Sequence, residues 1–181
     1  MSSNNAGKAE AVKWIKENFK SGETCLDVGA GDGKWADLLD GYLQIYGVEV
    51  FNGNIINNNL SEKYNRIYNA DIRTFNYKYF DLIIFGDVIE HMSASEAQDV
   101  IKYAWDRCRN MIIAVPFRYR QGAIYGNPYE KHIQDDLTPE LFNIRYPGFM
   151  PIFINDNYAY YIKKLGGLDH GRRPRNYIVK C

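Results

Sequence analysis

The chain has 181 residues, enough for one domain with a full hydrophobic core and too few for two of ordinary size. Its 22 basic and 22 acidic side chains cancel, which argues against a general attraction to nucleic acid or to an anionic membrane. No apolar run is long enough to cross a bilayer, and residues 1–19 lack the apolar core of a signal peptide. Three cysteines without CxxC spacing argue against a disulfide framework and fit a reducing compartment. We therefore expect one cytoplasmic domain spanning residues 1–181.

The first part of the chain alternates helical patterns with short apolar runs. Apolar residues from Ala9 to Phe19 recur at helical spacing, and Ser21-Gly22 ends that pattern. The apolar run Thr24–Val28 predicts a buried strand, which a glycine-rich loop follows. The expected elements are a helix over 6–20, a strand over 24–28, a helix ending at 41, a strand over 44–50, a helix over 53–60 and a strand over 65–69.

The clearest strand of the sequence is "FDLIIFGD", Phe80 to Asp87. A helix is expected from about residue 94 to residue 108, with Ser93 or Ser95 as its cap, and then a strand over 110–116 that Pro116 ends. Near-continuous apolar strands separated by helices are typical of a parallel sheet that is covered on both faces. The fold class expected from this pattern is therefore α/β, with a doubly wound Rossmann-like sheet.

Residues 116–137 show no clear period, and a loop of this length in a compact domain is usually functional, so an active-site lid or acceptor loop is expected there. Thr138-Pro139 then predicts a helix start. The remaining expectations are a sixth strand over 149–155, a capped helix over 155–167 with a glycine stop, and a last edge strand over 176–180.

The glycine-rich stretch "LDVGAGDGKW" admits three cofactors at first sight. A phosphate-binding loop needs Ser or Thr after Gly33-Lys34, and Trp35 stands there instead. A dinucleotide fold needs G-x-G-x-x-G, and Lys34 occupies the position of the last glycine. The pattern D-x-G-x-G-x-G is complete, and it suits S-adenosylmethionine, whose methionine part needs close backbone approach and a carboxylate, Asp27, for its ammonium group.

Acidic residues follow the successive strands, at the edge where open α/β sheets bind ligands. Glu49 ends the second strand and can accept from both ribose hydroxyls, although the same placement also suits NAD. Asp71 follows the third strand and can accept from an adenine amino group, while Ile72 offers an apolar surface to the ring. The residues expected to bind the cofactor are Asp27, Gly29, Ala30, Gly31, Glu49, Val50, Asp71, Ile72 and Asp87.

Taken in series, "LDVGAGDGKW", "YGVEV", "NADI" and "FDLIIFGDVIEHM" resemble the motifs of class I S-adenosylmethionine-dependent methyltransferases. The similarity runs from about Cys25 to Pro116 and is weaker beyond it. The resemblance implies a seven-stranded sheet, mostly parallel with one antiparallel strand, and a methyltransferase activity.

The stretch "DVIEHM" and a later histidine are expected to form the catalytic face. Asp87, Glu90 and His91 share one face if a helical turn starts at Asp87, and His132 lies in the long loop that can fold back over them. Glu90, His91 and His132 are the expected catalytic residues, because an oxygen acceptor must lose its proton to a base or to a metal ion.

The same four residues, Asp87, Glu90, His91 and His132, suit a divalent ion such as Mg²⁺, Mn²⁺ or Zn²⁺. They resemble the metal set of small-RNA 2′-O-methyltransferases, from which this chain departs by Asp87 in place of Glu, and also the ubiquinone-pathway O-methyltransferases. A histidine base without metal and a purely structural role of the Glu-His pair are the alternatives. Glu-His after the fourth strand also occurs in members of the superfamily with no known metal.

The expected function is O-methylation of a small-molecule or glycan hydroxyl. Three alternatives stay open: an RNA 2′-O-methyltransferase, a non-catalytic S-adenosylmethionine-binding partner subunit, and a nucleotide-dependent dehydrogenase. The basic cluster "HGRRPRN", residues 170–176, could contact RNA, but such clusters are more often solvated turns. Tyr119, Tyr125 and Tyr129 could line an acceptor pocket or pack the lid. The sequence does not define the acceptor or the oligomeric state.

Overall fold

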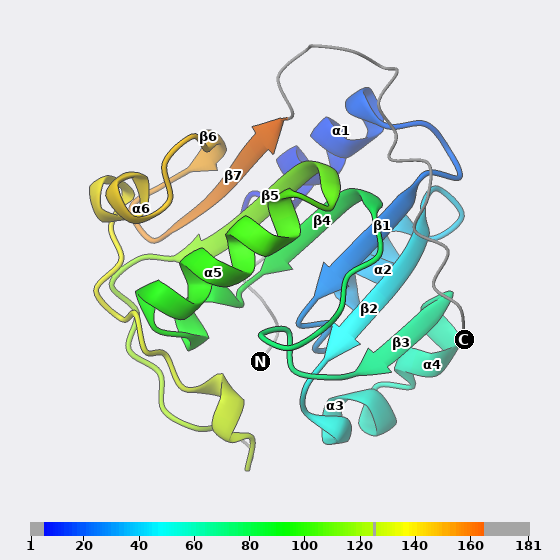
Figure 1. The fold of residues 1–181 in the computed structure, drawn as a ribbon, viewed down its shortest axis with the longest axis horizontal. Helices are drawn as coiled ribbons and strands as arrows, with labels where there is room; N and C mark the ends of the chain where they lie inside the picture. Colours follow the sequence, from blue (N-terminus) through cyan, green and yellow to red (C-terminus); the bar gives the residue numbers. More distant parts are fainter. Residues whose placement is uncertain (1–5, 125, 165–181) are drawn as a thin grey trace.

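A computed structural model describes residues 6–124 and 126–164 of the chain. Its centre is a seven-stranded sheet in the order β3-β2-β1-β4-β5-β7-β6 (Figure 1). Strand β7 runs antiparallel to both of its neighbours, and β3, β2, β1, β4 and β5 pair in parallel. The strands are β1 (Thr24–Val28), β2 (Gln44–Glu49), β3 (Arg66–Asn69), β4 (Phe80–Gly86), β5 (Cys108–Pro116), β6 (Met150–Ile154) and β7 (Tyr158–Lys164).

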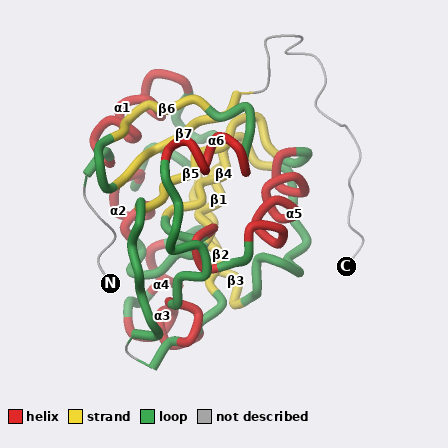
Figure 2. The backbone as a smooth tube through the Cα atoms, turned by 90° about the vertical axis from the view of Figure 1, so that its left-hand side faces the viewer, coloured by secondary structure: helices red, strands yellow, loops and turns green. Residues whose placement is uncertain are grey.

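Helices cover both faces of the sheet, as the apolar strands predicted (Figure 2). One face packs on α1 and α2 through Ala11, Ile15 and Leu39, and the other packs on α5 through Ala97 and Ala104. The helices are α1 (Lys8–Asn18), α2 (Lys34–Leu39), α3 (Asn52–Asn57), α4 (Leu60–Lys63), α5 (Ala94–Trp105) and α6 (Pro139–Arg145), with short 3₁₀ turns η1 (Ile89–His91) and η2 (Pro128–Glu130).

The helix caps agree with the sequence. Ser93 caps α5, since its side chain accepts from the Glu96 backbone while the Glu96 carboxylate accepts from the Ser93 backbone. Thr138 caps α6 by accepting from the Leu141 backbone, without a reciprocal partner, and Pro139 lies in the first turn. The doubly wound α/β fold, its seven strands and its single antiparallel strand are confirmed.

The helix expected over residues 155–167 was wrong, because this stretch forms β7 in the interior of the sheet. Asn155 does not cap a helix; its side chain accepts from the Asn157 and Tyr158 backbones and shapes the turn between β6 and β7. Residues 158–162 are buried on both faces, so the run carries no alternation that would mark it as a strand. The expected edge strand over 176–180 and the basic cluster over 170–176 lie outside the described residues.

The carboxyl ends of β1, β2, β3, β4 and β5 meet at one edge of the sheet, and the loop after β5 lies at the same edge (Figure 1). Within the described part of the chain, no helix is long and apolar enough to span a membrane.

Candidate active site

A cavity of about 780 Å³ opens at this edge of the sheet. Its wall includes Gly29–Gly31 after β1, Glu49 at the end of β2, and Asp71 with Ile72 after β3; we call this part the glycine-loop half. The other part, which we call the histidine half, is lined by Glu90, His91, Phe117, Tyr119 and His132. Of the residues that the sequence singled out, Ala30, Val50, Asp87 and Tyr129 also line the cavity.

The glycine loop is fixed against the end of β2 by backbone hydrogen bonds. Gly29 N–H and Ala30 N–H both donate to the Val48 carbonyl, at 2.8 and 3.1 Å. Gly29 has a φ of 69°, and a Cβ at this position would lie 2.6 Å from Cγ2 of Val88. Only glycine fits such a left-handed, crowded position, so the loop can approach a ligand with bare backbone.

Glu49 ties the loop to the cavity floor through both of its carboxylate oxygens. Oε2 accepts from Gly31 N–H at 2.9 Å and Oε1 accepts from Phe51 N–H at 2.7 Å. Each oxygen keeps a second lone pair for a ligand hydroxyl. Glu49 is therefore held in place by two backbone hydrogen bonds in the absence of a ligand.

Asp27 lies beneath the glycine loop rather than in the cavity wall. Its carboxylate Oδ2 accepts from the Tyr64 hydroxyl at 2.6 Å, and Oδ1 has no hydrogen-bond partner within the described part of the chain. Burial raises the pKa of this carboxyl to about 7. Asp27 is not among the described residues that line the cavity. Its expected contact with a cofactor ammonium group therefore stays a prediction, which this geometry does not support.

Asp71 lines the cavity, but it is already engaged. Its carboxylate accepts from Arg73 through Nε at 3.0 Å and Nη2 at 2.6 Å, and this guanidinium holds the pKa of Asp71 below its usual value. Arg73 also donates to Glu96 of α5 at 3.0 Å. An adenine amino group would therefore share Asp71 with Arg73.

Asp87 has a φ of 58°, which is unusual for a residue with a side chain. Its Oδ1 accepts from the hydroxyl of Tyr158 on β7 at 2.5 Å, and burial raises the pKa of Asp87 to about 6. The 3₁₀ turn η1 begins only at Ile89, so Asp87 does not share a helical face with Glu90 and His91. The expected set of four is thereby split, with Asp87 on the glycine-loop side.

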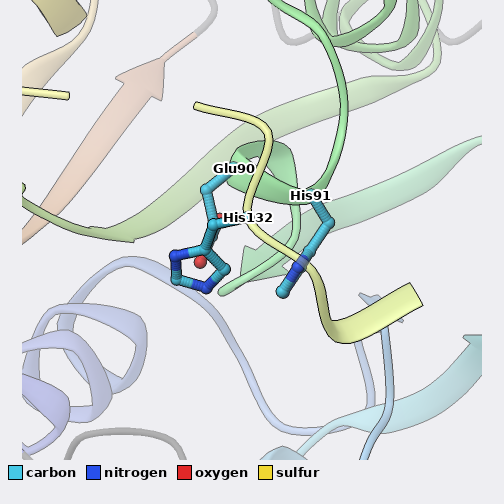
Figure 3. Close-up of side chains that lie close together, drawn as sticks. All are labelled: Glu90, His91 and His132. Atoms are coloured by element: carbon cyan, nitrogen blue, oxygen red, sulfur yellow. The ribbon is translucent and has the colours of Figure 1, made fainter. Parts of the chain in front are cut away.

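Glu90, His91 and His132 do converge (Figure 3). One ligand atom from each lies within 4.8 Å of the others, and the two imidazole centroids are 4.8 Å apart. Glu90 has no exposed surface, and neither of its carboxylate oxygens has a hydrogen-bond partner among the described residues. Burial, followed by the nearby charge of Asp87, raises the pKa of Glu90 well above its usual value.

Both histidines have the same hydrogen-bond arrangement. Nδ1 of His91 lies 3.2 Å from the Lys131 carbonyl, and Nδ1 of His132 lies 2.7 Å from the Tyr119 carbonyl. Because a carbonyl can only accept, each Nδ1 carries the proton and each Nε2 presents a lone pair. Burial lowers the pKa of both rings, which favours this neutral form.

The loop that carries His132 is docked on η1 by its backbone. Ile133 N–H and Gln134 N–H both donate to the Glu90 carbonyl, at 2.7 and 3.0 Å. The Gln134 amide donates to the Ile89 carbonyl at 2.7 Å, and its oxygen accepts from the Tyr146 hydroxyl at 2.8 Å. These contacts bring His132 beside residues that are about forty positions away in the sequence.

Sequence reasoning missed several residues of the cavity wall: Lys8, Trp35, Arg118, Tyr158 and Tyr160. The two tyrosines were hidden by the wrong helix over 155–167, and Lys8 by its place in an ordinary amphipathic helix. Tyr119 and Tyr129 line the cavity, whereas Tyr125 lies outside the described residues.

Comparisons with known proteins agree with the fold. Among solved structures, a S-adenosylmethionine-dependent methyltransferase from Clostridium acetobutylicum ATCC 824 matches with a TM-score of 0.67 and 13% identity, covering 88% of this chain and 90% of that one. The 1,6-didemethyltoxoflavin-N1-methyltransferase of Burkholderia thailandensis, solved with S-adenosylhomocysteine, matches with a TM-score of 0.63 and 16% identity. The match covers 87% of this chain and 76% of that one. A Pnkp1/Rnl/Hen1 RNA repair complex matches with 0.62 and 15%, covering 89% of this chain and 42% of that one. At such identities the likeness shows the fold alone.

A search of curated protein sequences gave no significant match. The family model described as "Methyltransferase domain" matches residues 5–104, more than half of the chain. This match favours a methyltransferase over the dehydrogenase alternative, and it confirms the resemblance seen in the glycine and strand-end motifs. The chain therefore belongs to the methyltransferase domain family and is a methyltransferase with the class I, S-adenosylmethionine-dependent fold.

Proposed function

We propose that this methyltransferase binds S-adenosylmethionine in the glycine-loop half and methylates a hydroxyl of a small-molecule or glycan-like acceptor in the histidine half. The observation that carries the proposal is the convergence of Glu90, His91 and His132, of which one ligand atom each lies within 4.8 Å of the others (Figure 3). A neutral amine can attack the methyl group with its own lone pair. A neutral hydroxyl is a poor nucleophile and needs a group that takes its proton. Such proton acceptors are what this half of the cavity offers.

The glycine-loop half suits the cofactor along the order of the strands. Asp71 and Ile72 at β3 would face the adenine, Glu49 at β2 the ribose hydroxyls, and the bare backbone of Gly29–Gly31 the methionine part. Asp87 at the end of β4 would take the ammonium group in place of the buried Asp27. The reactive methyl would then point toward the histidine half.

In the reaction these side chains bind, orient and accept a proton. Methyl transfer is an in-line displacement, so placement of the hydroxyl oxygen against the methyl carbon supplies much of the rate enhancement. Nε2 of His91 or His132 takes the hydroxyl proton, and the carboxylate of Glu90 stabilises the resulting imidazolium. Residues 117–119, 121 and 127–133 of the loop after β5 line the site, where they would limit the access of water to a bound acceptor.

The same three side chains suit a divalent ion, and we propose Mn²⁺, Zn²⁺ or Mg²⁺ as candidates. A carboxylate without a protein partner and two Nε2 lone pairs, with each Nδ1–H held by a carbonyl, form the ligand pattern of protein metal sites. Ligands of one ion at ~2.1 Å lie at most about 4.2 Å apart, so small side-chain rotations must close the present 4.8 Å. When bound, the ion would lower the pKa of an acceptor hydroxyl.

The experiment that tests the function is transfer of a labelled methyl group from S-adenosylmethionine into fractions of a cell extract, with and without chelator. We expect label in low-molecular-weight fractions, and a carbon-13 shift of the new methyl group typical of a methyl ether. A methyl group on nitrogen would overturn O-methylation. Metal is tested separately by equilibrium dialysis of the chelator-treated protein against Mn²⁺ or Zn²⁺. The metal proposal fails if His91→Ala and His132→Ala bind as much ion as the wild type does.

A second candidate function is 2′-O-methylation of an RNA terminus. The Glu90-His91 pair with His132 favours it, since the set resembles that of small-RNA methyltransferases. It predicts labelled RNA that loses reactivity at its terminal ribose toward periodate. Salt-insensitive activity on small hydroxyl compounds would argue against it.

A further inference from the structure

Arg118, the second residue after β5, is an exposed cation in the cavity wall, between Phe117 and Tyr119 of the histidine half. Its guanidinium makes no hydrogen bond, ion pair or aromatic contact within residues 6–124 and 126–164. The other arginines in these ranges each have an ion pair or lie over an aromatic ring: Arg66, Arg73, Arg107, Arg109, Arg120 and Arg145. The guanidinium of Arg118 is therefore available to a ligand in the cavity.

The backbone of Arg118 is left-handed, with a φ of 49°, which residues that carry a Cβ rarely adopt. Hydrogen bonds hold the chain at this point: Arg118 N–H donates to the Leu137 carbonyl at 2.9 Å, and Phe117 N–H donates to the Asn157 carbonyl at 2.8 Å. Backbone strain of this kind clusters at sites that bind or react. Glycine or asparagine would fit the same backbone more easily, so a need for the guanidinium itself accounts for an arginine here.

The chain next to Arg118 also fixes one of the proposed proton acceptors. The carbonyl of Tyr119 accepts from Nδ1 of His132 at 2.7 Å, and the two rings are 5.5 Å apart. Consecutive Cα atoms lie about 3.8 Å apart, so Arg118 is an immediate neighbour of the residue that holds His132. Arg118, Tyr119 and His132 all line the cavity. A small acceptor whose hydroxyl meets Nε2 of His132 can therefore reach Arg118 with a second group.

The other charges of this loop favour an anion beside Arg118. Lys131 is exposed and lines the cavity, and its carbonyl accepts from Nδ1 of His91. The carboxylate of Glu130 also lines the cavity, but it accepts from the amides of Asn127 and Gln121, each at 3.3 Å. The acid is thus held by the loop itself, whereas the two cations face the space that an acceptor would fill.

We infer that the acceptor is a small anionic molecule and that Arg118 binds its carboxylate or phosphate group while His91 or His132 receives the proton of its hydroxyl. The inference rests on the proposed function, because it narrows a small or glycan-like acceptor to an acidic one, such as a sugar acid or a sugar phosphate. A planar guanidinium can donate two parallel hydrogen bonds to either group. Such a contact fixes the orientation of the acceptor and with it the direction of its hydroxyl.

The alternative role for Arg118 is that of a solvated surface charge near Glu140 of α6. The pKa of Glu140 is lowered first by a hydrogen bond from its own backbone, then by one from Thr138, and least by the charge of Arg118. Glu140 is exposed and is not among the described residues that line the cavity. A surface charge affects stability at most, whereas a ligand-binding arginine affects how much acceptor the enzyme needs.

The first test uses the labelled product that the wild type makes from S-adenosylmethionine and the low-molecular-weight fraction of a cell extract. We expect an anion exchanger to retain this product at neutral pH, whereas an uncharged methyl ether passes through. Alkaline phosphatase removes a phosphate monoester, and amidation with a carbodiimide neutralises a carboxylate. The treatment that abolishes retention therefore identifies the anion, and no variant is needed.

The second test compares Arg118→Asn with Arg120→Asn, using the same fraction as acceptor. Asparagine tolerates the left-handed backbone and removes the charge. Arg120 is the matched control, since it is exposed, pairs with Asp135 at 3.3 Å and is not among the described residues that line the cavity. We expect Arg118→Asn to need about 10- to 100-fold more acceptor for half-saturation, while its maximal rate changes less than about 3-fold. Its melting temperature should be no lower than that of the wild type.

A labelled product that passes through the exchanger would overturn the inference alone, and so would an Arg118→Asn protein that needs no more acceptor than Arg120→Asn does. Absence of methyl transfer by the wild type, or label confined to RNA, would overturn the proposed function and the inference with it. If Arg118→Asn does not fold, the charge of the product and Arg118→Lys decide. Lysine keeps the charge without the planar fork, so its need for acceptor should exceed that of the wild type.

Discussion

The two halves of the cavity are built in different ways. The glycine-loop half is made of residues at the ends of neighbouring strands, and hydrogen bonds such as that from Gly31 N–H to Glu49 hold it. The histidine half depends on a loop that returns to η1 and brings His132 beside His91. The glycine-loop half thus depends on the pairing of the parallel strands, whereas the histidine half also needs the contacts of the docked loop.

The docking contacts of that loop are largely made by main-chain atoms. Ile133 and Gln134 N–H groups bind the Glu90 carbonyl, and His91 donates to the Lys131 carbonyl. The side chains of Tyr119 and Tyr129 line the cavity beside these main-chain contacts. This division predicts that substitutions in the two halves separate cofactor binding from methyl transfer.

The largest expected effect is on transfer, from Glu90→Gln. This buried carboxylate faces both histidines, and its loss should lower the rate of labelled methyl transfer by about 10²- to 10⁴-fold, while S-adenosylhomocysteine affinity changes less than about 3-fold. Glu17→Gln, on the exposed surface of α1, is the control for the chemical change. A comparable loss of S-adenosylhomocysteine affinity in Glu90→Gln would mean that the two halves are not separable.

The next expected effect is on the pH dependence of the free energy of unfolding, through the buried carboxyl of Asp27 beneath the glycine loop. The carboxyl titrates near 3.8 in the unfolded chain and near 7 in the fold, and at about 1.4 kcal/mol per pKa unit the difference corresponds to about 4 kcal/mol. Below pH 3.8 Asp27 is protonated in both the folded and the unfolded chain, so its burial does not lower the free energy of unfolding. Between pH 3.8 and pH 7 the unfolded chain releases the Asp27 proton while the folded chain keeps it, so the free energy of unfolding falls as pH rises. Above pH 7 both forms are ionised and the loss of stability is constant.

Asp27→Asn removes this titration while its amide oxygen can still accept from Tyr64. The melting temperature of the variant should therefore exceed that of the wild type at pH 8, and the excess should shrink toward pH 4. Parallel melting curves across this range check the sign. A variant that is less stable than the wild type at pH 8 would show that the ionised carboxylate is compensated inside the loop.

The glycine-loop half could be predicted from the sequence to a greater extent than the histidine half. Strands β1 and β2 follow from local apolar runs and glycines, and one of the two serines that the sequence offered as the cap of α5, Ser93, is the cap. The direction of Asp27 was missed because β1 is buried on both faces, so alternation carries no signal. Lys8 and Tyr158 reach the cavity through helix and strand packing that no local pattern encodes. The sequence predicted that His91 and His132 lie together, because both can act as a base or a metal ligand. Their hydrogen bonds to the Lys131 and Tyr119 carbonyls are seen only in the structure.

A smaller effect is expected from Glu49→Gln, on affinity. Each carboxylate oxygen accepts from a backbone N–H, so an amide nitrogen must face the N–H of Gly31 or Phe51, donor against donor. Affinity for S-adenosylhomocysteine and for 5′-methylthioadenosine should fall together by about 10- to 100-fold, because both ligands carry the ribose. Titration calorimetry measures both. Weakening of only one ligand would place Glu49 away from the ribose.

The smallest expected effect is on how the loop docks, from Gln134→Leu. This buried amide donates to the Ile89 carbonyl and accepts from Tyr146 and Arg145, and its loss leaves these three groups without that partner. We expect about a 10-fold lower transfer rate and a melting temperature a few degrees lower, with S-adenosylhomocysteine affinity unchanged. Gln134→Glu, which keeps the acceptor for Tyr146 and loses the donor to Ile89, should fall between the wild type and Gln134→Leu. If transfer is unaffected while the melting temperature falls, the backbone contacts to Glu90 alone are sufficient to hold His132 in place.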